Sequence, residues 1–173
     1  DTLCGLTFRI SSQSFYQVNA TQTEVLYNEA IRLANLTGAE TVIDAYCGTG
    51  TIGLVAARRG AARVIGVDSV PSAIRDAANN ARHNGVENAE FVTQDATAFM
   101  KELAASEERS QPLVLLMDPP RAGSTPEFLE AATSLAPERI VYISCNPATQ
   151  ARDVRQLVES GCLLYTSDAA DDS

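Results

Sequence analysis

A glycine-rich loop and an acid that follows it are the first residues of the sequence with the means to bind a ligand. The segment Gly48-Thr-Gly50-Thr-Ile-Gly53 has the G-x-G-x-x-G pattern, in which glycines let a ligand approach the backbone and a helix N-terminus closely. Asp68 follows 20 residues after Gly48, where a carboxylate can accept hydrogen bonds from both ribose hydroxyls of an adenosine. NAD and S-adenosylmethionine both contain adenosine, so these residues leave both as candidate cofactors.

Two further turns carry residues suited to catalysis. Asp118-Pro-Pro-Arg121 places an acid before two prolines, and each proline fixes its own φ, so the loop is stiff enough to hold a carboxylate against a flat substrate. Ser144-Cys-Asn-Pro147 places Cys145 just before a predicted helix with Asn146 as its N-cap, and the positive end of that helix favours a thiolate. Cys47 fits a small buried hydrophobe better. Hydride transfer has no evident use for either turn, which disfavours NAD.

Alternating strands and helices must position these turns. We expect buried strands at 41–46, 63–68, 89–93, 113–117 and 139–144, with helices near 52–59, 71–84, 96–105, 126–135 and 147–159. Before them, 6–10 resembles an edge strand and 21–36 an amphipathic helix capped by Gly38. Near-continuous Val, Ile and Leu runs predict a doubly wound α/β fold with a mainly parallel sheet, whose strand ends carry the ligand sites. Asp95, after the third strand, could contact an adenine amine or cap a helix.

Composition narrows the class of protein. The 173 residues carry 13 basic and 22 acidic side chains, a net charge of −9. A nucleic-acid-binding domain is usually basic, so we expect any RNA partner to be held mainly by regions outside this sequence. No apolar run approaches the ~20 residues of a membrane span, so no membrane partner is expected. The cysteines are widely spaced, which disfavours a metal site or disulfides and fits a reducing cytoplasm; they are Cys4, Cys47, Cys145 and Cys162.

The motifs, taken in order, resemble the catalytic domain of the RNA (uracil-5-)-methyltransferases. The matching segments are Ser14-Phe-Tyr-Gln-Val-Asn19, Asp44-Ala-Tyr-Cys-Gly-Thr-Gly50, Asp118-Pro-Pro-Arg121, Ser144-Cys-Asn-Pro147 and Arg152-Asp153. The resemblance spans about Leu6 to Gly161, and it is greater to the bacterial 23S ribosomal RNA members than to the transfer RNA member. It implies a class I S-adenosylmethionine-dependent fold that lacks the last two strands of the family sheet.

The resemblance also implies roles for single residues. Cys145 would be the nucleophile that adds to C6 of a uridine, so that C5 can accept the methyl group of S-adenosylmethionine. Arg121 and Asn146 are candidate donors to the uracil carbonyls. The residues that would contact the cofactor, from the resemblance or from the loops above, are Gln17, Tyr46, Gly48, Gly50, Asp68, Asp95 and Asp118.

The expected organisation has three parts. Residues 1–40 lead into the catalytic domain, 41–161 form the methyltransferase domain, and 162–173 resemble the read-through translation of a sequencing adapter and are expected to be non-native. Relatives in the family carry an N-terminal RNA-binding barrel and a C-terminal Glu that removes the C5 proton. Neither is found in this sequence, so we expect the chain alone to have little or no turnover. The alternatives are an NAD-dependent oxidoreductase, an amino-group methyltransferase and a cofactor-binding remnant without catalysis.

Overall fold

The computed structural model describes residues 2–7, 20–106, 112–144 and 146–162. The strands are β1 (Thr2–Leu3), β2 (Leu6–Thr7), β3 (Thr41–Ala45), β4 (Arg63–Asp68), β5 (Ala89–Thr93), β6 (Leu113–Met117) and β7 (Arg139–Tyr142). The helices are α1 (Ala20–Ala34), α2 (Thr51–Arg58), α3 (Pro71–His83), α4 (Ala96–Ala105), α5 (Pro126–Ser134) and α6 (Pro147–Glu159). Two predicted site residues, Gln17 and Cys145, lie outside the described residues.

The described part of the chain contains a five-stranded parallel sheet in the order β5-β4-β3-β6-β7. From the central β3 the chain builds outward through β4 to β5, and then returns to the other side of β3 to add β6 and β7. The order therefore reverses between β3 and β6, and ligands of such sheets bind beyond the carboxyl ends of the strands at this switch point. This arrangement confirms the predicted doubly wound, parallel α/β fold.

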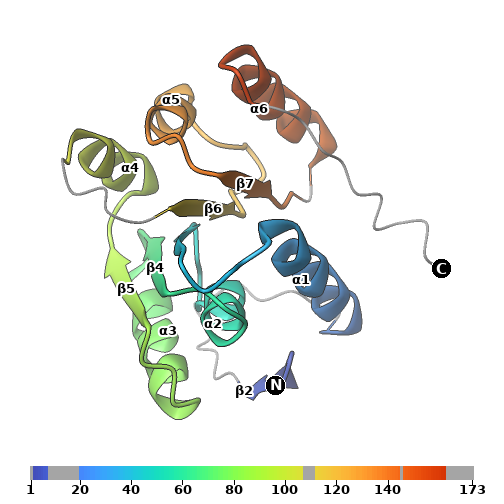
Figure 1. The fold of residues 1–173 in the computed structure, drawn as a ribbon, viewed down its shortest axis with the longest axis vertical. Coiled ribbons are helices and arrows are strands. Elements are labelled where there is room, and N and C mark those ends of the chain that lie inside the picture. Colours follow the sequence, from blue (N-terminus) through green and yellow to red (C-terminus); the bar gives the residue numbers. More distant parts are fainter. Residues whose placement is uncertain (1, 8–19, 107–111, 145, 163–173) are drawn as a thin grey trace.

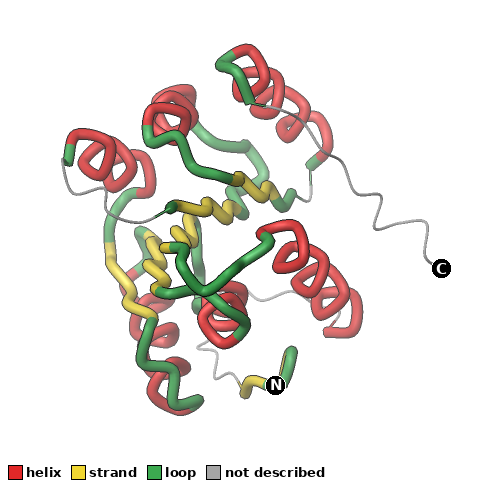
Figure 2. The backbone as a smooth tube through the Cα atoms, viewed as in Figure 1, coloured by secondary structure: helices red, strands yellow, loops and turns green. Residues whose placement is uncertain are grey.

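Helices cover both faces of the sheet. Figures 1 and 2 show α1, α2 and α3 on one side of the strands and α4, α5 and α6 on the other. Side chains of one register row, Val42, Val64 and Val114, belong to the core beneath α1 and α2. The next row along the strands, Ile43, Ile65 and Leu115, belongs to the core with α4 and α5. Successive residues of a strand point to opposite faces of the sheet. Because helices bury both faces, the strands need the near-continuous apolar runs seen in the sequence.

The segment before the sheet differs in detail from expectation. β2 pairs antiparallel with β1 and includes only the first residues of the predicted strand 6–10, whose remainder lies outside the described residues. Helix α1 ends at Ala34, and Asn35 takes the left-handed conformation with a φ of 50°. The predicted cap at Gly38 is therefore wrong. Asn is among the few non-glycine residues that adopt this conformation readily, so the left-handed residue lies at position 35 and the helix ends two residues earlier than predicted.

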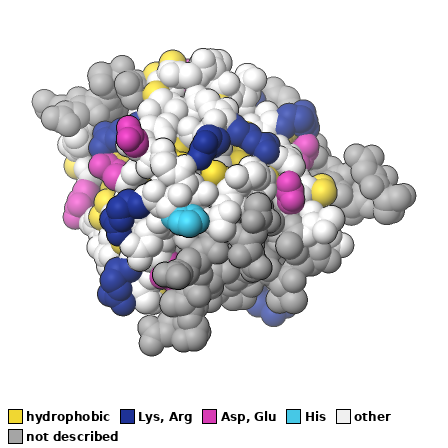
Figure 3. Space-filling model, turned by 90° about the horizontal axis from the view of Figure 1, so that it is seen from below, with side chains coloured by type: hydrophobic (Ala, Val, Ile, Leu, Met, Phe, Trp, Pro, Cys, Tyr) yellow, Lys and Arg dark blue, Asp and Glu magenta, His cyan; other side chains and the backbone are white. Residues whose placement is uncertain are grey.

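Figure 3 shows one face of the molecule, on which Lys and Arg side chains (dark blue) and Asp and Glu side chains (magenta) are both present. Within the described ranges, no helix combines the length and apolar character that crossing a membrane would require.

Candidate active site

The glycine loop after β3 leaves one face of its backbone open. Gly48 and Gly50 have positive φ values of 56° and 81°. A Cβ on Gly50 would lie 2.8 Å from the Phe91 ring, whereas a Cβ on Gly48 would meet nothing within 4 Å. Gly50 is thus required for packing and for the turn, while Gly48 leaves its surroundings open to a ligand.

Asp68, at the end of β4, is held in a fixed orientation next to this loop. Its Oδ2 accepts a hydrogen bond of 2.9 Å from the Gly48 backbone N–H, and its Oδ1 accepts one of 2.9 Å from the N–H of Val70. Each carboxylate oxygen can accept a further hydrogen bond. The side chain can therefore receive the two hydroxyls of a ribose without changing its position.

Asp44 and Asp118 place two carboxyl groups near the ends of neighbouring strands. Asp44 is 1% exposed, and its oxygens have no side-chain hydrogen-bond partner within the described part of the chain. Burial, followed by the charge of Asp118, raises the pKa of Asp44 to about 8, while the backbone N–H of Gly53 acts in the opposite direction. Burial also raises the pKa of Asp118 to about 6. Among the described residues no cation pairs with any of these carboxyl groups, so a cationic ligand nearby would favour their ionised form.

Tyr46 adopts an uncommon backbone conformation directly before the glycine loop. Its φ is 60°, a value that non-glycine residues rarely take and that is concentrated at functional sites. The phenol lies 3.0 Å from Oγ of Ser124, and its ring contacts Phe128 with centroids 5.4 Å apart. Burial raises the pKa of Tyr46, so the phenol remains protonated at neutral pH.

Asp95 is the N-cap of α4. Its Oδ2 accepts a hydrogen bond of 2.9 Å from the Ala98 N–H, and its backbone is extended, as N-cap residues usually are. Of the two alternatives that the sequence left open for Asp95, the helix cap is the one seen in this structure. A contact with adenine stays a prediction.

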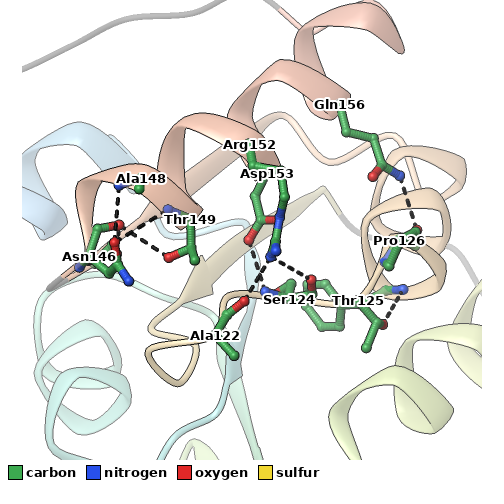
Figure 4. Close-up of polar contacts among 12 residues, drawn as sticks. Ala122, Ser124, Thr125, Pro126, Asn146, Ala148, Thr149, Arg152, Asp153 and Gln156 are labelled. Atoms are coloured by element: carbon green, nitrogen blue, oxygen red, sulfur yellow. Dashed lines mark hydrogen bonds and ion pairs between the residues drawn. The ribbon is translucent and has the colours of Figure 1, made fainter.

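The two turns for which the sequence predicted a catalytic role are in contact. Asn146 caps α6 by accepting hydrogen bonds from the N–H groups of Ala148 and Thr149 (Figure 4). Its Nδ2 donates to the Arg121 carbonyl at 3.2 Å. Oγ of Ser144 accepts a 2.9 Å hydrogen bond from the Asn146 N–H. Asn146 therefore contacts the Asp-Pro-Pro-Arg loop directly, and Ser144 is hydrogen-bonded to Asn146.

The Arg121 side chain itself is exposed. Cys47 is buried, and burial raises its thiol pKa well above the ordinary value, which confirms its interpretation as a packed hydrophobe. Gln17 and Cys145 cannot be compared with their predicted roles, because they lie outside the described residues.

The structure draws attention to three residues to which the sequence assigned no role of their own. Asp44 and Asp153 were noted only within the resemblance, although an acid inside the apolar strand Thr41-Val-Ile-Asp-Ala45 is itself a signal, because buried charges are rare without a purpose. Ser124 was not noted at all; it is buried, and its N–H donates a hydrogen bond to the buried Asp153 carboxylate. In the ranges that the structure describes, no group of His, Cys, Asp and Glu side chains is arranged to hold a metal ion.

Comparison with known proteins gives the family. A family model described as a methyltransferase domain matches residues 36–170. An RNA methyltransferase of Halalkalibacterium halodurans is 50% identical over 161 residues, which are 93% of this chain and 34% of that protein. One from Lactiplantibacillus plantarum is 52% identical over 161 residues, which are 93% of this chain and 35% of that protein. The chain thus spans about a third of the length of these relatives.

Solved structures that resemble this chain are also methyltransferases. The tRNA (uracil-54, C5)-methyltransferase of Pyrococcus abyssi, in complex with S-adenosyl-L-homocysteine, has a TM-score of 0.76 and 34% identity, covering 91% of this chain and 37% of that one. A methyltransferase from Agrobacterium tumefaciens, with a TM-score of 0.72 and 21% identity over 92% of this chain and 56% of that one, shares the fold. These matches confirm the methyltransferase fold and the S-adenosylmethionine cofactor over the NAD alternative. The chain belongs to the methyltransferase-domain family.

Proposed function

We propose that this chain is the catalytic domain of an enzyme that methylates C5 of a uridine in RNA, with 23S ribosomal RNA as the target. The observation that carries the proposal is the 3.2 Å hydrogen bond from Asn146 Nδ2 to the Arg121 carbonyl. It joins the turn on either side of Cys145 to the loop that begins with Asp118, so both turns can act on one base. The named relatives of this chain are RNA methyltransferases, and the Pyrococcus abyssi enzyme methylates uracil C5, which supports the proposal.

The cofactor half of the site consists of the glycine loop and the carboxylates around it. Asp68 would receive the ribose hydroxyls, and the open face of Gly48 would lie against the ligand. Asp118 and Asp44 suit the positive charge of S-adenosylmethionine, since both lack a cationic partner among the described residues. When bound, S-adenosylmethionine supplies an electrophilic methyl group. Gln17 is retained as a further contact on the strength of the sequence motif.

Cys145 would supply the covalent step. Its place directly before α6 favours the thiolate, because a helix N-terminus stabilises negative charge. The thiolate adds to uracil C6, and the C5=C6 electron pair moves toward the O4 carbonyl, which makes C5 a carbon nucleophile. C5 would take the methyl group as the S–CH3 bond of the donor breaks, which leaves S-adenosylhomocysteine. A base would then remove the C5 proton, and the thiolate would leave as the C5=C6 double bond re-forms. Arg121 would donate to a uracil carbonyl while that oxygen carries negative charge.

We propose that the chain binds S-adenosylmethionine. Because it spans about a third of the length of its relatives, the activity assay uses a protein of their full length. A suitable protein is a hybrid enzyme, in which this chain replaces the segment that it matches in the Halalkalibacterium halodurans relative.

The test offers the hybrid enzyme unmethylated 23S ribosomal RNA and unmethylated transfer RNA with labelled S-adenosylmethionine. Digestion to nucleosides and mass spectrometry then identify the product. Label in 5-methyluridine from 23S RNA is the expected result. Label in transfer RNA would overturn the choice of target, and label on a base amino group would overturn the C5 chemistry. A thermal shift of the chain with NAD but not with S-adenosylmethionine would overturn the cofactor.

A further inference from the structure

One face of α6 is hydrogen-bonded along its length to the segment that follows β6. The side chains recur every three or four residues, so they project from one side of the helix toward that segment (Figure 4). They are Asn146, Thr149, Arg152, Asp153 and Gln156. The last contact joins Gln156 Nε2 to the Pro126 carbonyl at 3.1 Å, where the segment becomes helix α5. The helix therefore contacts the loop from its first turn to its last.

Backbone carbonyls of the loop accept most of these bonds. The Thr149 hydroxyl donates to the Arg121 carbonyl at 3.1 Å, and Nη2 of Arg152 donates to the Ala122 carbonyl at 2.8 Å. Nη2 of Arg152 also lies 3.5 Å from the Ser124 carbonyl. These contacts are made to the main chain of the loop, so they depend on the path of its backbone and not on its side chains.

Asp153 is the centre of the network. Its side chain is only 2% exposed, and its Oδ2 accepts a 2.9 Å hydrogen bond from the Ser124 N–H and a 2.6 Å hydrogen bond from the Tyr142 hydroxyl. Its Oδ1 accepts from the guanidinium of Arg152 at 3.1 Å. One carboxylate thus joins the end of β7, the loop after β6 and α6. Buried charges with several donors are costly to disturb, because the donors lose their partner together.

The hydrogen-bond network around Asp153 extends to Tyr46, beside the glycine loop, and it leaves no space for a side chain at position 123. The Tyr46 hydroxyl, next to the glycine loop, lies 3.0 Å from Oγ of Ser124, whose N–H binds Asp153. Gly123 has a φ of 82°, and a Cβ there would lie 2.5 Å from Nη2 of Arg152 and 2.7 Å from Oδ2 of Asp153. The loop can therefore approach α6 this closely only with glycine at that position.

We propose that Arg152 and Asp153 are positioning residues that hold the loop 118–125 in register with the turn 144–146. The inference rests on the proposed function, in which Asp118 serves the methyl donor and the turn carries the nucleophile. Neither Arg152 nor Asp153 contacts substrate in this role. Their effect is on the relative placement of the two halves of the site, and a misplacement of about 1 Å can cost about 100-fold in rate.

The direct test compares two arginines of the same helix. Arg152→Ala removes the contacts to the loop carbonyls, and its matched control Arg155→Ala removes an exposed side chain whose only described ion pair is a 3.9 Å contact with Glu159. In the hybrid enzyme we expect Arg152→Ala to lower kcat by about 10-fold or more with a change in the Kd of S-adenosylmethionine below about threefold. Arg155→Ala should leave both unchanged. Equal kcat values for the two variants would overturn the proposal.

A second measurement does not depend on RNA methylation. Asp153→Asn in the 173-residue chain removes the charge and leaves one acceptor oxygen for Ser124 and Tyr142. We expect the Ser124 amide to exchange its hydrogen about 10-fold faster, while the amides of β3 keep their protection. Unchanged exchange at Ser124 would overturn the positioning role, and equal acceleration throughout β3 would show a general loss of stability instead.

The two proposals fail in different ways. If the hybrid enzyme methylates no RNA, the proposed function fails, and hydrogen exchange at Ser124 still tests the positioning role of Arg152 and Asp153. If the hybrid enzyme is active and the kcat of Arg152→Ala equals that of Arg155→Ala, the proposed function stands and the positioning role fails. If Asp153→Asn does not fold, Arg152→Ala supplies the exchange measurement as well, because the Arg152 side chain is 59% exposed and its loss leaves no cavity in the core.

Discussion

The backbone N–H of Gly48 donates a 2.9 Å hydrogen bond to Oδ2 of Asp68. This contact joins the glycine loop after β3 to the end of the neighbouring strand β4, so the two parts of the proposed adenosine site have a fixed spacing before any ligand binds. A preformed site loses little conformational entropy on binding. The contact also means that a change at Asp68 affects the loop as well as the ribose.

Asp68→Ala should weaken the binding of S-adenosylmethionine by about 10- to 100-fold, because hydrogen bonds to a charged group contribute about 1.5–3 kcal/mol. Isothermal titration calorimetry on the chain measures the Kd. Glu87→Gln is the control, since it removes one negative charge from an exposed residue in the turn after α3. An Asp68→Ala variant that binds as tightly as Glu87→Gln would contradict the ribose assignment.

Gly48→Ala and Gly85→Ala form a matched pair. Both glycines have a positive φ, 56° and 65°, and a Cβ at either would meet nothing within 4 Å. The backbone strain should therefore destabilise both variants alike, by about 1–2 kcal/mol. Gly48 adjoins the proposed ligand and Gly85 follows α3, so we expect Gly48→Ala to weaken cofactor binding and Gly85→Ala to leave it intact. Thermal melts and calorimetry measure the two effects, and equal Kd values would place the ligand elsewhere.

Cofactor binding should depend on pH through Asp118 and Asp44, whose pKa values are raised to about 6 and about 8. A cation favours the ionised carboxylates, so affinity for S-adenosylmethionine should increase as pH rises from 5 to about 8. Asp118→Asn should remove the part of this increase near pH 6. A Kd that is constant over this range would show that neither carboxylate interacts with the ligand charge.

The contribution of Asp118 to the stability of the ligand-free chain should fall as pH rises, whereas its contribution to cofactor affinity should increase. A raised pKa means that the folded state keeps a proton that the unfolded state has already released, so this group favours folding at low pH and the advantage disappears as pH rises from about 4 to about 6. Asn imitates the protonated acid. The melting temperature of Asp118→Asn should therefore increase relative to the unchanged chain as pH rises from 4 to 7. A constant difference would contradict the raised pKa.

Cys145→Ala in the hybrid enzyme should abolish methylation and leave the Kd of S-adenosylmethionine within about threefold, because the thiolate acts on the uracil. Cys47→Ala is the control, as Cys47 is buried and its raised pKa keeps it protonated. RNA containing 5-fluorouridine supplies a second readout, since fluorine at C5 blocks proton removal and retains the adduct. Peptide mapping of the adduct to a cysteine other than Cys145 would overturn the mechanism.

Much of the fold could be predicted from local patterns. The apolar runs at Val42-Ile43 and Val114-Leu115 are continuous because both faces of a central parallel strand are buried, and this requirement is visible in the residue types themselves. Pro71 and Pro126 each begin a helix as predicted, because proline fits the first turn, where its missing N–H is not needed. The end of α1 was predicted wrongly, since Gly38 and Asn35 can both take the left-handed conformation and sequence does not choose between them.

The sequence by itself determined the chemistry at each strand end: the open glycine at 48, the acids at 68 and 118, and Asn146 as a helix cap. These depend on residue type and on a few neighbours along the chain. Only the tertiary structure decided that Asn146 contacts the Arg121 carbonyl and that Asp153 joins Ser124 to Tyr142. Such partners are separated by a helix and a strand, so their meeting depends on how β6, β7 and α6 pack, and packing is set by the whole core.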